Sequence, residues 1–347
     1  MSFNFIEATI NNFYIHTVGN KVADEKFFIS KRKTKASNEL KTLLSHYFLS
    51  PFNSEEYYHF HHDTDLYLNE TYSYVSKIFN NSESLYEQSI NLAKHLYNHC
   101  VHPKIKGGEF YIVYFKNCSL SGQTLDAVGL FKSENKDTFL EVEQLNDGFN
   151  IESRQGININ NLDKGCLIFN TEKENGYVIS IVDNTNKGAE AQYWKDNFLN
   201  VSVINNSFHQ TNQFLGITKQ FVTKQLNEKF NITKTEQIDF LNRSVDYFKT
   251  HDTFNKQEFE KDIFTDINVI ESFQKFDQEY RQENEVELSD NFEISAKAVK
   301  KQARVFKSVL KLDKNFHIYI HGNRELIEQG IDEDGRKYYK LYYQNEQ

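Results

Sequence analysis

Residues 109–115 (EFYIVYF) and residues 124–131 (TLDAVGLF) are two apolar runs in the middle of the chain. Their length and their aromatic and β-branched content are typical of buried strands. We expect residues 137–144 to continue this meander and residues 148–156 to add a further edge. The central part of the chain therefore predicts a largely antiparallel sheet.

The segments on both sides of these runs extend the same pattern. Residues 5–18 alternate in polarity, which predicts a strand. Residues 26–30 (KFFIS) predict a second strand that runs back beside it. Apolar residues at helical spacing predict helices at 37–48, 66–79 and 85–102. Residues 156–170 and 176–183 (GYVISIVD) predict two more paired strands. We therefore predict an N-terminal α+β domain over residues 1–205.

Strand patterns become rare after residues 202–207, where we place the domain boundary. We expect helices at 208–230, 235–251, 256–264 and 269–280, and an exposed acidic arm at 278–290. Residues 316–321 (FHIYIH) and 338–343 (YYKLYY) read as strands that pair with each other, with a short helix at 323–329 between them. The second domain, residues 206–347, is thus predicted to be helical with a small β unit at its end, and the fold class is α+β.

Composition narrows the range of functions. The 347 residues carry a formal net charge of -9, which argues against a protein wrapped all over by nucleic acid, so any such contact must be local. Cys100, Cys118 and Cys166 are far apart in apolar sequence, and we expect buried thiols in a reducing cytoplasm. No run reaches the ~18 apolar residues of a membrane span, and the N-terminus does not resemble a leader. We expect no membrane association.

Residues 295–312 (SAKAVKKQARVFKSVLKL) carry the strongest positive charge in an acidic chain. The spacing predicts one helix over the whole stretch, capped by Ser295, with an apolar face opposite a basic face. The basic face comprises Lys297, Lys300, Lys301, Arg304, Lys307 and Lys311. Ammonium groups arranged in this way displace counterions from phosphates, which predicts contact with the DNA backbone. The alternative is a solvated helix that pairs with the acidic residues 258–293.

Two weaker patterns suggest metal chemistry. Asp126 followed by Glu134 and Lys136 has the residue types with which Mg²⁺-dependent nucleases hold their ion and the scissile phosphate. His59, His61 and Asp63 would share one face of a strand, but we interpret them as a structural strand end. There is no phosphate-binding glycine motif, and we predict neither a metal nor a cofactor.

Five stretches, in the same order along nearly the whole chain, resemble the 37-kilodalton nucleoid-associated protein family of bacteria. They are residues 11–21 (NNFYIHTVGNK), 162–170 (LDKGCLIFN), 193–201 (YWKDNFLNV), 240–248 (FLNRSVDYF) and 310–320 (LKLDKNFHIYI). The resemblance implies a cytoplasmic protein of the nucleoid that binds double-stranded DNA with little sequence preference. For some members it also implies contact with type II topoisomerases. It supplies no catalytic residue.

Three hypotheses follow. The first is a non-enzymatic homodimer that binds double-stranded DNA through the basic helix, with the tyrosine-rich terminal strand as its self-pairing edge. The second is an adaptor that reaches the nucleoid through a topoisomerase-like partner, to which the acidic residues 258–293 would dock. The third is a Mg²⁺-dependent nuclease built on Asp126, Glu134 and Lys136.

Overall fold

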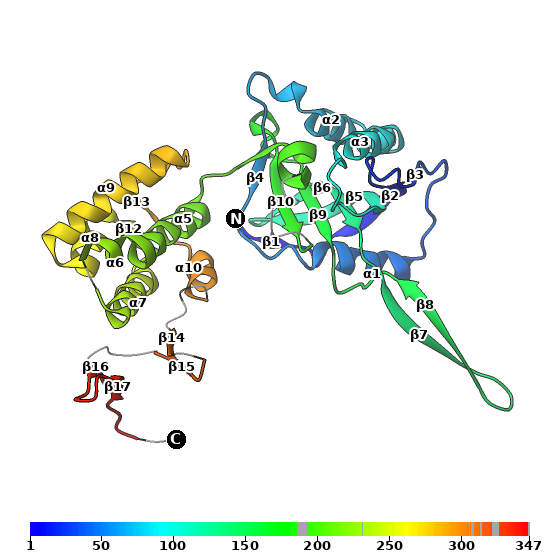
Figure 1. Cartoon of the computed structure of the whole chain (residues 1–347). Coiled ribbons are helices and arrows are strands. Elements are labelled where there is room, and N and C mark those ends of the chain that lie inside the picture. Colours follow the sequence, from blue (N-terminus) through cyan, green and yellow to red (C-terminus); the bar gives the residue numbers. More distant parts are fainter. Residues whose placement is uncertain are drawn as a thin grey trace. The chain divides into compact units, whose positions relative to one another are not determined.

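The computed structural model describes residues 1–185, 193–230, 232–304, 306, 309–312, 314–320 and 326–345. The chain forms two compact units, Met1–Ile204 and Asn205–Gln347. Antiparallel strands and helices make up the first unit, and the second is mainly helical with short strands (Figure 1). The fold is α+β, as the sequence predicted.

The first unit is built on a nine-stranded sheet in which all neighbouring strands are antiparallel. Its order is β11-β4-β10-β9-β6-β5-β2-β3, and β1 pairs with the end of β5. The strands are β1 (Phe3–Asn4), β2 (Thr9–Val18), β3 (Phe27–Phe28), β4 (Tyr58–Phe60), β5 (Gly108–Leu120), β6 (Gln123–Ser133), β9 (Lys164–Phe169), β10 (Val178–Asp183) and β11 (Val201–Val203). Both apolar runs of the sequence lie at its centre, because β5 pairs with β6 over almost their full lengths.

A two-residue turn joins these central strands. Ser121 and Gly122 both have positive φ, 50° and 81°, which is the backbone of the tight turn that suits twisted antiparallel strands. The register that follows places Tyr111 opposite Phe131 and Val113 opposite Gly129. Gly129 has no room for a Cβ atom, which would lie 2.3 Å from the Phe131 ring.

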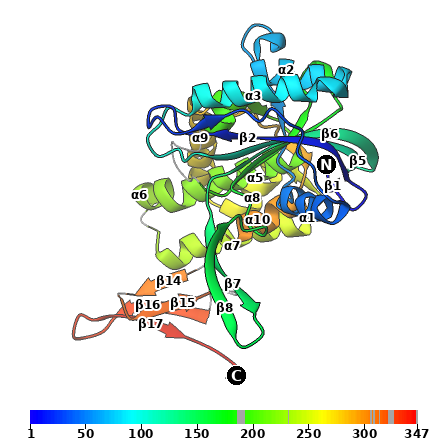
Figure 2. The ribbon, with the colours of Figure 1, turned by 90° about the vertical axis from the view of Figure 1, so that its right-hand side faces the viewer.

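Both faces of the sheet are covered, which explains why residues 109–115 are apolar throughout. Phe110, Ile112 and Tyr114 pack on one face with the helices α2 (Glu70–Asn80) and α3 (Leu85–His99) and the π-helix η4 (Tyr193–Leu199). Residues of the opposite parity, such as Tyr111 and Val113, pack on the other face with α1 (Asn38–Leu49). Figure 2 shows α2 and α3 on one side of the sheet and α1 on the other. Short 3₁₀ helices complete the connections: η1 (Leu66–Leu68), η2 (Ser82–Ser84) and η3 (Lys173–Asn175).

One part of the predicted meander does not join the sheet. The strands β7 (Asp137–Gln144) and β8 (Phe149–Gly156) pair only with each other, and they project as a hairpin in Figure 1. The prediction that they extend the meander is wrong, because β6 pairs directly with β9, Ala127 opposite Phe169. Among the strands that the structure describes, the hairpin therefore has no neighbour within the sheet.

The second unit is a helical bundle with an aromatic core. Its helices are α5 (Ser207–Gln220), which continues as the π-helix η5 (Phe221–Gln225) and α6 (Leu226–Phe230), then α7 (Lys234–Thr250), α8 (Lys256–Phe264), α9 (Ile267–Glu283) and α10 (Ala296–Ala303). The four helices predicted at 208–280 are present. The rings of Phe214, Phe248 and Phe254 lie within 6.1 Å of one another, centroid to centroid, at the centre of this core. Because α9 continues to Glu283, the expected acidic arm begins as a helix.

Short strand pairs complete this unit. They are β12 (Thr253–Asn255) with β13 (Asn291–Glu293), β14 (Val309–Leu312) with β15 (Phe316–Tyr319), and β16 (Ile327–Ile331) with β17 (Lys337–Leu341). The predicted pairing of residues 316–321 with 338–343 is therefore wrong, since each strand pairs with a nearer one. The short helix expected at 323–329 is also wrong at Ile327 and beyond, where the chain is extended; residues 323–325 lie outside the described part.

Candidate nucleic-acid interface

The basic helix α10 begins where the sequence predicted. The Ser295 side chain accepts a hydrogen bond from the backbone N–H of Ala298, and the Ser295 N–H donates to Thr211 Oγ1 of α5 at 3.0 Å. Ala298 and Val299 are buried, and Gln302 Nε2 donates to Asn212 Oδ1 at 2.7 Å. One face of α10 is thus fixed in the bundle, and the other faces solvent.

The predicted helix over residues 295–312 is wrong in its second half. The helix ends at Ala303, and Lys311 lies on the strand β14. Residues 309–312 alternate, with Leu310 buried and Lys311 exposed, because β14 pairs with β15 and Leu310 packs against Ile238. The six basic residues of the predicted face therefore do not share one face of a helix.

Four of the six basic residues predicted to contact DNA lie on α10 or directly after it. Lys297, Lys300 and Lys301 are exposed on α10, and Arg304 is the exposed residue that follows it. Lys307 lies outside the described residues. Lys301 Nζ lies 5.4 Å from the centroid of the Phe208 ring. The side chains of Lys300 and Arg304, one helical turn apart, have no hydrogen bond or ion pair in the described part of the chain.

Lys300 and Arg304 border a pocket of about 510 Å³ between α10 and the end of α7. Phe248, Val299 and Ala303 contribute its apolar surface. Its polar lining also includes Lys249, His251 and Asp252. Lys249 is held by Asp246 at 3.0 Å, so the cations available to an external anion here are Lys300 and Arg304. Such groups can neutralise phosphates, and phosphate contacts carry no sequence information.

The structure does not bring Asp126, Glu134 and Lys136 together. Asp126 and Ser133 stand seven residues apart on β6, or ~23 Å in an extended strand. Asp126 accepts from Lys116 Nζ at 2.7 Å and Lys136 Nζ donates to Glu109 at 2.6 Å. Glu134 is buried against Lys132. These residues form separate ion pairs.

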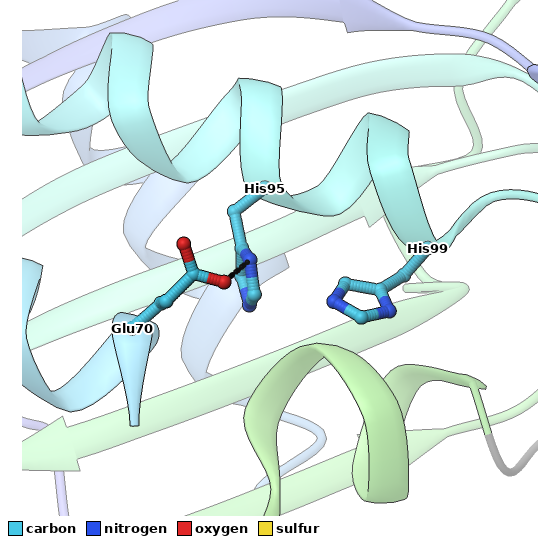
Figure 3. Close-up of side chains that lie close together, drawn as sticks. All are labelled: Glu70, His95 and His99. Carbon is cyan, nitrogen blue, oxygen red and sulfur yellow. Dashed lines mark ion pairs between the residues drawn. The ribbon is translucent and has the colours of Figure 1, made fainter. Parts of the chain in front are cut away.

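The histidine cluster at residues 59–63 is also divided. His59 Nε2 lies 3.0 Å from a Glu172 oxygen, whereas His61 Nε2 lies 3.3 Å from Asp63. A different set, Glu70, His95 and His99, places one ligand atom of each residue within 4.8 Å of the others (Figure 3). Sequence reasoning missed this set, although two histidines four residues apart on a predicted helix were a signal for it.

The acidic segment at 258–293 is partly neutralised within its own unit. Asp277 is 1% exposed and is paired with Lys256 and Arg281. Glu260 is buried beside them, and burial raises the pKa of its carboxyl. The exposed acids that remain on α8 and α9 include Glu258, Glu271 and Glu279. They leave an acidic surface available to a basic partner.

The protein is thus an α+β protein of two compact units. Its net charge is negative, and exposed basic residues gather on α10 and at Arg304. The family model described as nucleoid-associated protein YejK matches residues 15–336, and the chain belongs to this family of nucleoid-associated proteins. No curated protein sequence matches the chain. In the described residues, no helix combines the length and apolarity needed to cross a membrane.

Proposed function

We propose that this protein binds the backbone of double-stranded DNA in the cytoplasm, as a component of the nucleoid, with little sequence specificity. The contact surface is α10 and the residue after it, with Lys300 and Arg304 at its centre. The observation that carries the proposal is that these two cations are exposed, adjacent and unpaired in the described part of the chain, on a helix whose other face is buried. Lys297, Lys301, Lys307 and Lys311 are secondary contacts.

A local interface also fits the net charge of -9. Binding must depend on a small number of phosphates, because the net negative charge of the chain opposes an extended contact with DNA. If about four to six phosphates are neutralised, log K falls against log salt with a slope of about −4 to −5. The protein acts without catalysis in this proposal, since Asp126, Glu134 and Lys136 are each engaged in a separate ion pair.

The test is the affinity of the full chain for a labelled duplex of mixed sequence. The variant Lys300→Glu/Lys301→Glu/Arg304→Glu is expected to lose measurable binding. A matched control, Lys229→Glu/Lys261→Glu/Lys275→Glu, changes the net charge equally at exposed lysines of the same unit and is expected to retain most of it. Equal losses in the two variants would indicate a net-charge effect and contradict the α10 interface.

The second candidate function is an adaptor that reaches DNA through a type II topoisomerase or a similar enzyme. The exposed acids of α8 and α9 favour it, because they repel DNA and attract basic protein surfaces. In that case the pure protein does not shift DNA at low salt, and it co-elutes with the enzyme. The adaptor hypothesis is contradicted if the pure protein shifts DNA in a salt-dependent way and the Lys300→Glu/Lys301→Glu/Arg304→Glu variant does not.

We also propose that the protein is a homodimer. Val142 lies opposite Ile151 in the β7–β8 hairpin, and Leu140 and Phe149 lie on the same face of it. Each of these four apolar side chains is 58–70% exposed. A hairpin without a packing partner is marginally stable in water, which favours a second apolar surface against this face. Two copies on one duplex raise the apparent affinity through avidity.

A further inference from the structure

Two helix ends bring three metal-ligating side chains together in the first unit. The helices α2 and α3 are joined by only four residues, so they run antiparallel, and the first turn of α2 lies beside the last turn of α3. Glu70 is the first residue of α2. His95 and His99 stand four residues apart on α3 and therefore share one face. Figure 3 shows the carboxylate and both rings converging.

The hydrogen bonds of His95 are not satisfied by a neutral ring alone. Its Nε2 lies 3.1 Å from the Phe198 carbonyl oxygen, which can only accept, so this nitrogen carries the ring proton. Its Nδ1 lies 2.7 Å from Glu70 Oε2, which is also an acceptor when ionised. A proton can lie between these two atoms at 2.7 Å, and a metal ion can take its place once they stand ~3.3 Å apart. A carboxylate and a neutral imidazole are both metal ligands, so Glu70 and His95 can exchange that proton for a metal ion.

His99 supplies the third ligand. Its ring centroid lies 4.6 Å from that of His95, with the ring planes at 79°. Among the residues that the structure describes, none makes a hydrogen bond or ion pair with the His99 side chain. The His99 ring is half-buried, and the Glu70 side chain is 57% exposed, so an ion can enter from solvent on the Glu70 side.

We propose that Glu70, His95 and His99 bind one divalent transition-metal ion, for which zinc is the best fit. Two imidazoles and one carboxylate are a common zinc set with a fourth position open to water, whereas magnesium and calcium prefer oxygen ligands alone. Tetrahedral zinc places its ligand atoms ~3.3 Å apart, so the Glu70–His95 pair opens slightly while His99 approaches. The Phe198 carbonyl then holds His95 in place as an outer-shell partner.

The first measurement is a calorimetric titration of the metal-stripped full chain with ZnCl₂. We expect one equivalent to bind and the thermal midpoint of the unit that contains Trp194 to rise. Replacement by Co²⁺ should give the intense visible absorption of a four-coordinate site. A wild-type chain that binds no zinc, or a Co²⁺ spectrum typical of six-coordinate hydrated ion, overturns the proposal.

Variants assign the ligands. His99→Ala removes a side chain without hydrogen bonds to described residues, so the fold should persist, and zinc affinity should fall by more than the ~10–100-fold typical of outer-shell losses. Glu70→Gln, at an exposed position, is expected to weaken binding likewise and serves if His99→Ala misfolds. His61→Ala removes a histidine that pairs with Asp63, outside the proposed site, and should leave the affinity for zinc unchanged. Equal affinity in wild type, His99→Ala and Glu70→Gln, or equal loss in His61→Ala, contradicts the site.

Discussion

The Lys132 ammonium lies 3.0 Å from the Glu134 carboxylate, and these side chains are only 0% and 3% exposed. Lys132 Nζ also donates to the Lys106 carbonyl at 2.7 Å, and Glu134 Oε1 accepts from the Tyr193 hydroxyl at 2.9 Å. Two buried charges are tolerated only when the geometry is good and their remaining hydrogen bonds are satisfied. Both conditions hold here, so Glu134 has a structural role.

Removing one partner of this pair should be strongly destabilising. We expect Glu134→Ala to lower the free energy of unfolding by about 3–5 kcal/mol, because it leaves the Lys132 charge buried without a counterion. Urea unfolding followed by the fluorescence of Trp194, the sole tryptophan, measures this in the first unit. The double variant Lys132→Met/Glu134→Leu should recover most of the loss. A double variant less stable than Glu134→Ala would show that packing, not charge, dominates.

Single neutral substitutions on α10 should change the salt dependence of DNA binding. We expect Lys300→Ala to reduce the magnitude of the log K against log salt slope by about 1, because one phosphate contact is lost. Weakening should be similar on unrelated duplex sequences, since phosphate contacts carry no sequence information. The measurement is anisotropy of a labelled duplex across a salt series.

Lys275→Ala is the matched control for this slope. Lys275 is exposed on α9 and pairs with Glu279 at 3.7 Å, so its removal should leave the slope unchanged. If Lys275→Ala reduces the slope as much as Lys300→Ala, the DNA contacts are not centred on α10.

Local sequence patterns predicted the elements better than their partners. Residues 109–115 could be recognised as a strand because consecutive residues pack on opposite faces of a covered sheet. The hairpin at 137–156 shows the limit. Its strands follow from alternation, but its exclusion from the sheet follows from the β6–β9 pairing, which brings together segments far apart in the sequence. Pairing over such separations leaves no local signal.

The candidate sites show the same limit. Ser295 and the first bases of α10 were found because capping and charge are local properties. Lys311 was misplaced because residues 305–312 fit both a helical and an alternating pattern, and the partner strand at 316–319 selects the second. Glu70 was missed beside His95 because only the turn between α2 and α3 brings them together.

A buried histidine should make the first unit sensitive to acid. His16 is 1% exposed, its Nε2 lies 3.0 Å from Ser89 Oγ, and burial lowers its pKa to about 4. Between about pH 6.5 and 4 the unfolded chain binds a proton that the native chain does not, so stability falls as pH falls. From pH 7 to pH 5 we expect this residue to cost about 2 kcal/mol.

The test compares urea unfolding at the two pH values by Trp194 fluorescence. His16→Gln should be less stable at pH 7 but lose most of this pH dependence. His46→Gln, at an exposed position on α1, should retain it. An unchanged pH dependence in His16→Gln would contradict the assignment.

The two compact units should unfold separately. Each contains its own buried cluster, one around Ile112 and Trp194 and the other around Phe214 and Phe248. We therefore expect limited proteolysis near residues 202–207 to leave two resistant fragments. In urea, Trp194 fluorescence should report the first unit alone, whereas helical circular dichroism should show a further transition. Coincident transitions by both probes would mean one cooperative domain.

A variant of the β7–β8 hairpin tests whether the proposed dimer forms through the apolar face of this hairpin. Leu140→Lys/Ile151→Lys alters two side chains that are 69% and 63% exposed, so the folded chain should tolerate it. If a second copy covers this face, sedimentation equilibrium should show a dimer in wild type and a monomer in the variant. Affinity for a long duplex should fall more than affinity for a short one, because avidity is lost.

The opposite face of the same hairpin provides the control. Glu143 and Asn150 face each other across the strands on its polar side, and Glu143→Lys/Asn150→Lys adds two lysines to that side. This variant should remain dimeric. If both variants are monomeric, charge repulsion rather than loss of apolar contact explains the result. If both remain dimeric, the dimer interface lies elsewhere. The tyrosine-rich β17, whose second edge has no partner among the described strands, is then the next surface to alter.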